Sequence, residues 1–122
     1  MAAAGLVYMG GGNLLQSLAA SSMAMQNSLG IVCDPIANRV EAPCLGKNVM
    51  AAMNAISSAN MALANYDQVI PLDEVIDAMD EVGKSMDSSL RCTGFGGLAI
   101  TKTAREIQLK LAEGKMVPLG GC

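Results

Sequence analysis

Apolar and uncharged polar residues fill the first thirty positions in a pattern that fits two helices. Residues 1–9 are almost wholly apolar and read as a helix that ends at the glycine run 10–12. Asn13 is a suitable N-cap for a second helix, which we expect to span residues 14–28 and to stop at Gly30.

A third helix is predicted from Asn48, as its N-cap, to about residue 64. It carries no charged residue, and Met50, Met53 and Met61 lie among alanines and serines. Methionine is a flexible filler of helical cores, so we expect these side chains to be core residues rather than ligands.

Two further helices follow, and both carry charge. The fourth, residues 72–86, follows Pro71 and separates an apolar face from a solvated acidic face. The apolar face comprises Leu72, Val75, Ile76, Met79 and Val82. The pattern from Thr103 to Glu106 is typical of a capping box and predicts a last helix that ends near Gly114.

The segment between the second and third predicted helices contains Cys33 and Cys44, each with a proline nearby. Because proline fixes φ and resists helix, we expect residues 34–43 to be rigid and non-helical. Two thiols on a stiff loop can be aimed at one point, as a metal or cluster site requires. On spacing alone, two unrelated buried thiols are favoured, because ten intervening residues match no common zinc or ferredoxin spacing.

Composition supports a single all-α domain. The chain has 122 residues and is 52% hydrophobic, but it has one phenylalanine, two tyrosines and no tryptophan. Alanine and methionine favour helix, whereas residues that favour strands are sparse. We therefore predict an all-helical domain of about five helices, with the cysteine loop between the second and third.

Charge and cysteine usage exclude several classes of function. A formal charge of −3, with Lys and Arg thinly spread, gives no footprint for nucleic acid. Four cysteines without a CxxC pair favour a reducing cytoplasm over a disulfide scaffold. No charged residue precedes Asp34, yet no apolar run is long enough to span a membrane. Such uncharged helices need covering by more protein, so we expect an oligomer or a partner segment.

The residues around the two cysteines resemble those of the bacterial iron–sulfur L-serine dehydratases. The resemblance is strongest at Leu29–Pro35, Pro43–Cys44 and Asn48–Met50, and the CDP…PC core is a specific signal. It continues through Met1–Ala4, Gly10–Gly11, Asn54–Ala55, Met61–Leu63, Asp73–Ile76, Thr93–Gly94, Gly96–Ala99 and Arg105–Glu106. Nearly the whole chain to about Gly114 is similar to the C-terminal part of that family's catalytic α domain or α subunit.

That resemblance implies a lyase of amino-acid catabolism that dehydrates and deaminates L-serine to pyruvate and ammonia. In the family a 4Fe–4S cluster acts as a Lewis acid, and the matching cluster ligands here are Cys33 and Cys44. The third ligand and a Ser-Ser-His motif lie upstream of the position that matches Met1, so we expect both to be missing. The implied partners are L-serine and either a β subunit or the missing N-terminal α segment.

This chain departs from the family pattern at four positions, Asn38, Arg39, Lys47 and Cys92. Asn38 replaces a glycine at a position that favours positive φ, where asparagine is well tolerated. Lys47 replaces an arginine and is a weak candidate for binding the substrate carboxylate. Cys92 stands where relatives commonly have glutamate. Some relatives place a C-terminal cysteine on the open iron, and Cys122 is a tentative further ligand of that kind. A chance terminal thiol is an equally open alternative.

Taken together, these features predict that residues 1–122 are the C-terminal part of a serine dehydratase α chain. A truncated product, one piece of a split subunit and a misassigned start all fit, and the chain alone should be inactive. One alternative is a non-catalytic helical assembly module. Another is a structural zinc or cluster site formed jointly by Cys33, Cys44, Cys92 and Cys122. The sequence does not identify the catalytic base.

Overall fold

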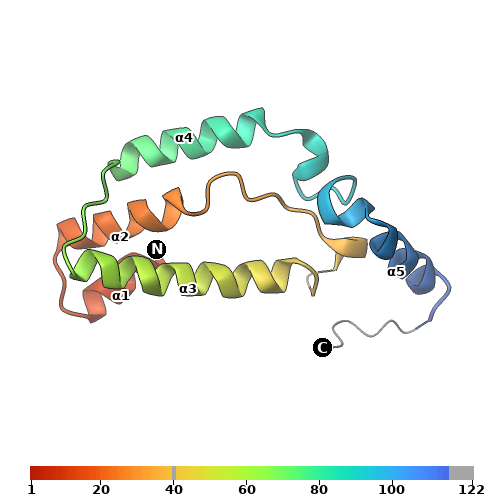
Figure 1. Cartoon of the computed structure of the whole chain (residues 1–122), viewed down its shortest axis with the longest axis horizontal. Helices are drawn as coiled ribbons and strands as arrows, with labels where there is room; N and C mark the ends of the chain where they lie inside the picture. Colours follow the sequence, from red (N-terminus) through yellow and green to blue (C-terminus); the bar gives the residue numbers. More distant parts are fainter. Residues whose placement is uncertain (40, 116–122) are drawn as a thin grey trace. The chain divides into compact units, whose positions relative to one another are not determined.

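The computed structural model describes residues 1–39 and 41–115, and these residues form five α-helices. The helices are α1 (Ala2–Met9), α2 (Leu14–Gln26), α3 (Cys44–Leu63), α4 (Leu72–Ser85) and α5 (Lys102–Ala112) (Figure 1). Short 3₁₀ turns occur at Ile36–Asn38, Ser88–Leu90 and Gly97–Ile100. The described residues contain no β-strand, only an isolated parallel bridge between Cys33 and Arg91. The predicted all-α fold is confirmed.

The start of α2 agrees with the sequence pattern. The Asn13 side chain accepts a hydrogen bond from the Gln16 backbone N–H at 2.9 Å. The Gln16 side chain in turn accepts one from the Asn13 N–H at 3.0 Å, which completes a capping box. Two otherwise unpaired donors of the first turn are thus satisfied, and α2 begins at Leu14 as predicted.

Two predicted helix starts are wrong by a few residues. Helix α3 begins at Cys44 rather than after Asn48, because the Pro43 carbonyl already accepts a bond from the Lys47 N–H at 3.1 Å. Cys44 therefore lies in the first turn of a helix and not on the loop. Helix α5 is capped by Thr101, whose hydroxyl accepts from the Ala104 N–H, and not by Thr103.

The chain divides into two compact units, which are described separately. Unit 1 comprises residues 1–31 and 49–85. Unit 2 comprises residues 32–48 and the described residues from 86 onward. No helix in the described residues combines the length and the apolar character that crossing a membrane requires.

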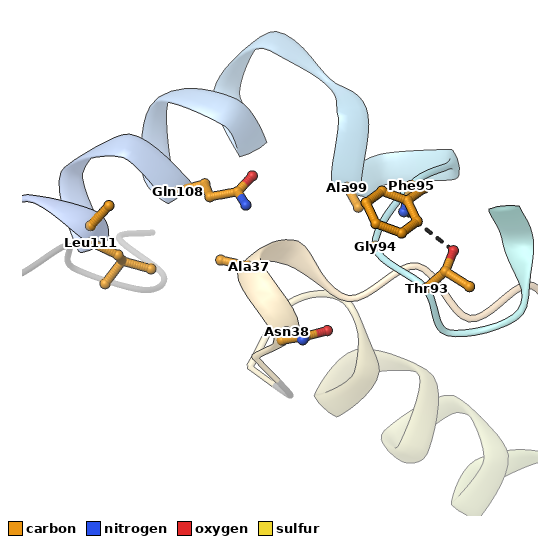
Figure 2. A pocket seen from close by; sticks show the side chains of 9 residues that line it. Ala37, Asn38, Thr93, Gly94, Phe95, Ala99, Gln108 and Leu111 are labelled. Carbon is orange, nitrogen blue, oxygen red and sulfur yellow. Dashed lines mark hydrogen bonds between the residues drawn. The ribbon is translucent and has the colours of Figure 1, made fainter.

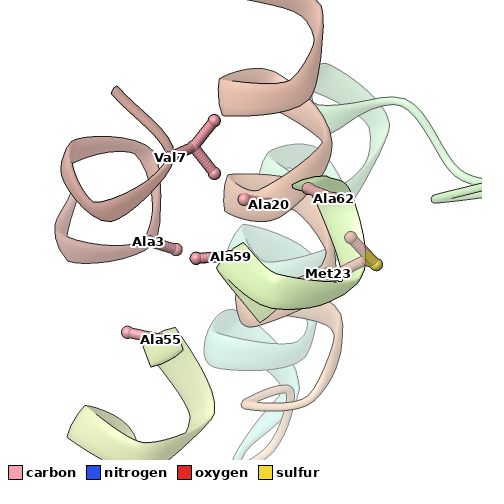
Figure 3. Close-up of a cluster of buried hydrophobic side chains, with 7 residues drawn as sticks. All are labelled: Ala3, Val7, Ala20, Met23, Ala55, Ala59 and Ala62. Carbon is pink, nitrogen blue, oxygen red and sulfur yellow. The ribbon is translucent and has the colours of Figure 1, made fainter. Parts of the chain in front are cut away.

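Small side chains form the core of unit 1. Figure 3 shows the buried cluster, which gathers Ala3, Val7, Ala20, Met23, Ala55, Ala59 and Ala62 from α1, α2 and α3. The prediction that the methionines of α3 are core residues is wrong for this chain. Met50, Met53 and Met61 are 47%, 56% and 37% exposed, because α3 turns its alanine face inward instead.

The uncharged polar residues of α2 bind neighbouring segments of unit 1. Fully buried Ser22 donates to the Ile70 carbonyl at 2.6 Å, and Gln26 donates to the Gln68 carbonyl at 2.9 Å. Asn54 of α3 donates to the Ala24 carbonyl at 2.8 Å. Buried polar groups are tolerated when they are hydrogen-bonded, so these side chains specify which faces meet.

Unit 2 is organised around Asp34, a carboxylate that is only 2% exposed. One carboxylate oxygen accepts a hydrogen bond from the Leu98 backbone N–H at 2.7 Å. The other accepts one from the Lys47 ammonium at 2.6 Å, and that ammonium also donates to the Val32 carbonyl. Gly97 has a φ of +56°, and a Cβ on it would lie 2.8 Å from the Asp34 Cβ, so the close approach needs glycine.

Competing influences act on the Asp34 carboxyl. Burial raises its pKa, but the Leu98 N–H and the Lys47 ammonium favour the ionised form. The hydrogen bonds and the charge outweigh burial, so the pKa lies below its ordinary value. The ionised carboxylate therefore stabilises unit 2.

We expect Gly12→Ala to lower the free energy of unfolding by about 1–3 kcal/mol, as overpacking does. A Cβ on Gly12 would lie 2.9 Å from Leu63 Cδ2 and closer still to Val7 Cγ1. Gly5→Ala in α1 is the matched control, because a Cβ there meets no atom within 4 Å. Alanine should raise stability at that helical site by about 0.5–1 kcal/mol. Urea denaturation followed by circular dichroism measures both, and equal effects would contradict the packing described.

Asp34→Asn should lower the free energy of unfolding by about 1–3 kcal/mol at pH 7, because it removes a buried charge-assisted pair. A lowered folded-state pKa means that the wild-type contribution is complete above the unfolded-state pKa of about 4. It is lost as the pH falls through the folded-state value. Urea denaturation between neutral and acidic pH measures this. The free energy of unfolding should fall less with decreasing pH in Asp34→Asn than in the wild type.

The matched control for the acid series is Glu41→Gln. Glu41 pairs with Arg39 at 2.9 Å on the surface, where solvent screens the interaction. The fall in the free energy of unfolding at acidic pH is assigned to Asp34. That assignment would be contradicted if Glu41→Gln changed this fall more than Asp34→Asn does.

Candidate functional site

The segment 32–39 places Cys33 beside a second segment of unit 2. The Cys33 N–H donates to the Leu90 carbonyl at 2.9 Å, and the Cys33 carbonyl accepts from the Cys92 N–H at 2.7 Å. These two bonds form the isolated parallel bridge with Arg91. The backbone of Cys33 is therefore fixed on both sides by one short stretch, 90–92.

The cysteines of the described chain have different environments. Cys33 and Cys44 are partly buried, Cys92 is exposed, and all three are free thiols. Downstream of Cys33, Asn38 has a φ of 58°, the left-handed conformation that the sequence predicted for this position. Ala37 has a φ of 52°, which the sequence did not predict.

Neighbouring groups shift the acidity of Cys33. Its pKa is raised to about 11, first by a hydrogen bond with the Cys92 side chain and then by burial. Negative charge on Cys92 and Cys44 acts in the same direction, whereas the Lys47 ammonium acts in the opposite one. Cys33, Cys44, Cys92 and Lys47 thus belong to one electrostatic neighbourhood.

This neighbourhood is not a completed metal site. In residues 1–39 and 41–115, no three His, Cys, Asp or Glu side chains are placed to hold one metal ion. The arrangement of Cys33, Cys44 and Cys92 therefore does not support the alternative of a structural metal site that these cysteines form jointly. Cys122, the tentative further ligand, lies outside the described residues.

The Lys47 ammonium is engaged within unit 2. It bonds to the Asp34 carboxylate and to the Val32 carbonyl, and its side chain is 28% exposed. These contacts hold the backbone on both sides of Cys33. A role for Lys47 in binding a substrate carboxylate stays a prediction.

A cavity of about 480 Å³ lies in unit 2 next to this segment. Figure 2 shows the side chains that line it: Ala37, Asn38, Thr93, Gly94, Phe95, Ala99, Gln108 and Leu111, with Ala112 completing the set. The polar groups are the Asn38 and Gln108 amides and the Thr93 hydroxyl. None of these lining residues is ionisable, so the cavity can hydrogen-bond a small polar molecule but offers no general base of its own.

The sequence singled out Cys33 and Cys44 as cluster ligands and Lys47 as a weak candidate for the substrate carboxylate. In the structure the three belong to one electrostatic neighbourhood, and their roles stay predictions. It did not foresee that Cys92 lies against Cys33 or that Asp34 organises the segment. In the sequence Cys92 stood out only as a departure from the family pattern, without a partner. Asp34 was visible only as part of the CDP motif, without a partner.

Comparison with known proteins identifies relatives over most of the chain. Residues 1–99 match the family described as serine dehydratase alpha chain. The chain is 50% identical over 116 residues to the probable L-serine dehydratase, alpha chain, of Bacillus subtilis, covering 95% of this chain and 39% of that protein. It is 51% identical over 108 residues to the L-serine dehydratase, alpha chain, of Peptoniphilus asaccharolyticus, covering 88% and 37%.

A longer relative matches in the same way. L-serine dehydratase 1 of Escherichia coli is 44% identical over 101 residues, which is 82% of this chain and 22% of that protein. The chain thus spans well under half the length of these three relatives. No solved structure matches it.

The family match includes both cysteines of the CDP…PC segment and confirms the resemblance read from the sequence. This chain therefore belongs to the serine dehydratase alpha chain family.

Proposed function

We propose that this chain is the C-terminal part of the catalytic α chain of an iron–sulfur L-serine dehydratase. Completed by the rest of that chain, it would convert L-serine to pyruvate and ammonia. The observation that carries the proposal is the family match over residues 1–99, which contains both motif cysteines as free thiols in one electrostatic neighbourhood.

The donor set fits part of an iron–sulfur site. Cysteine thiolates are the usual ligands of such clusters, and Cys33 and Cys44 are partly buried and not paired in a disulfide. Two thiols supply only part of a 4Fe–4S donor set, so the remaining protein ligand would come from elsewhere. When bound, the cluster would supply a Lewis acid for the loss of the serine hydroxyl, which is otherwise a poor leaving group.

The residues around the cysteines would position and shield that site. The Asp34–Lys47 pair holds the backbone of residues 32–34, and the bonds to residues 90 and 92 hold Cys33 itself. A ligand fixed in this way needs little rearrangement when it binds. No ionisable side chain lines the neighbouring cavity, so the base that removes the serine α-proton would come from outside that lining.

The partners we propose are the missing part of the α chain, a β subunit, or both, within an oligomer. Unit 1 supports this because its α1–α3 face is hollowed and apolar. The hollow has about 410 Å³ and is lined by Ala2, Gly5, Leu6, Met9, Ala52, Ala55 and Ile56. Exposed apolar surface of this kind marks interaction sites. A reducing cytoplasm fits the free thiols.

The same apolar face favours a second candidate, a non-catalytic assembly module. In that case the chain would associate through α1 and α3 without regard to iron. Iron dependence of the purified protein therefore separates the two functions.

We expect anaerobic reconstitution with iron and sulfide to load the chain in a manner that depends on Cys33 and Cys44. Cys33→Ser and Cys44→Ser should each reduce the iron and sulfide retained after desalting by severalfold, because each removes a thiolate ligand. Visible absorption and EPR spectra check the type of cluster. Cys92→Ser is the matched control and should retain as much iron as the wild type. Equal retention by all four proteins would overturn the ligand assignment.

The chain of residues 1–122 alone should release no pyruvate from L-serine, even after reconstitution, because its donor set is incomplete. A coupled assay of pyruvate formation measures this. Turnover above the rate of a protein-free blank would contradict the proposal that further α-chain residues are required.

A further inference from the structure

Cys33 and Cys92 lie against each other in unit 2 although they are far apart in sequence. The backbone N–H of Cys92 donates to the carbonyl of Cys33 at 2.7 Å. Standard bond lengths then keep the two Cα atoms within about 7 Å of each other. Disulfides usually span Cα distances of about 4.4–6.8 Å, so the backbones are close enough for one.

The backbone of Cys92 explains how its side chain reaches Cys33. In regular parallel pairing Cys33 lies opposite Arg91, and the next residue would point to the other face. Cys92 instead has a φ of 63°, which takes it out of the extended conformation. The Cys92 side chain is also the largest influence that raises the pKa of Cys33. A non-glycine residue with positive φ is uncommon, and such residues occur often at functional sites.

The two thiols differ in access. Cys92 is exposed, whereas Cys33 is partly buried. The backbone of Cys33 bonds directly to that of Cys92. The pair that is set to react is therefore Cys33 with Cys92, and a reagent from solution meets Cys92 first.

We propose that Cys33 and Cys92 form a reversible disulfide when the metal-free chain meets a hydroperoxide. The Cys92 thiolate attacks one oxygen of hydrogen peroxide, the O–O bond breaks, and Cys92 becomes a sulfenic acid with release of hydroxide. The Cys33 sulfur then attacks the Cys92 sulfur and expels water as the S–S bond forms. Counting protons, two thiols and one peroxide give one disulfide and two waters.

A consequence follows that rests on the proposed function. The sulfur of Cys33 cannot be both half of a disulfide and a ligand of iron. Oxidation would therefore hold the chain in a metal-free form until a thiol reductant restores both cysteines. Cys92 would act as the peroxide-reactive partner of a ligand cysteine and not as a ligand.

The test uses the chain of residues 1–122, made metal-free with a chelator and freed of reductant. After one equivalent of hydrogen peroxide, free thiols are blocked with N-ethylmaleimide, and the unreduced protein is digested and analysed by mass spectrometry. We expect a peptide that joins Cys33 to Cys92 and disappears with dithiothreitol. Free thiols should fall from the four cysteines of the sequence to half that number.

Matched variants identify the pair. Cys44→Ser should keep the linked peptide, whereas Cys92→Ser should lose it while its helical circular dichroism is unchanged. A Cys33–Cys44 link, a link between two chains, or sulfinic acid without any link would each overturn the proposal. Because this readout needs no iron, it succeeds or fails independently of cluster reconstitution.

The consequence for the cluster is tested separately. Peroxide-treated chain should retain severalfold less iron on reconstitution than reduced chain, and dithiothreitol should restore uptake. In Cys92→Ser the same peroxide treatment should leave uptake unchanged. Loss of uptake in Cys92→Ser as large as in the wild type would overturn the role of this disulfide.

Discussion

The buried carboxylate of Asp34 is the group on which the arrangement of unit 2 depends. It bonds both to the glycine turn before α5 and to Lys47 in the first turn of α3. A buried charge needs partners, and here each partner comes from a different stretch of chain. Lys47 also binds the Val32 carbonyl, so the residues on both sides of Cys33 are held. The backbone around the first motif cysteine is therefore held by an ion pair and by hydrogen bonds.

Much of the helical architecture could be predicted because its signals are local. Asn13 caps α2, Pro71 precedes α4, and the glycines after Met9 end α1, all as the pattern indicates. The start of α3 was misjudged because Asn48 looked like a cap, whereas Pro43 ends the loop earlier. The burial of the methionines could not be predicted, because local pattern does not reveal which face of an uncharged helix turns inward.

The candidate site was predictable where the family motif covers it. Cys33, Cys44 and Asn38 were singled out from the motif and its departures, and the left-handed φ of Asn38 was expected. The contact of Cys92 with Cys33 was not predictable, because a single backbone bridge brings these distant segments together. The unusual φ of Cys92 likewise has no sequence signal, since cysteine is not a typical residue for that conformation. Contacts of this kind require the fold.

The alanine-rich core of unit 1 has a consequence for how the protein tolerates sequence change. In most cores the harmful substitutions remove volume, because a cavity remains where a large side chain was. Five of the seven residues in this buried cluster are alanines, so there is little volume to remove. The destabilising substitutions are instead those that add volume, because even one added methyl group would push neighbouring helices apart. The interior positions of unit 1 can therefore accept only side chains below a certain size as the sequence evolves.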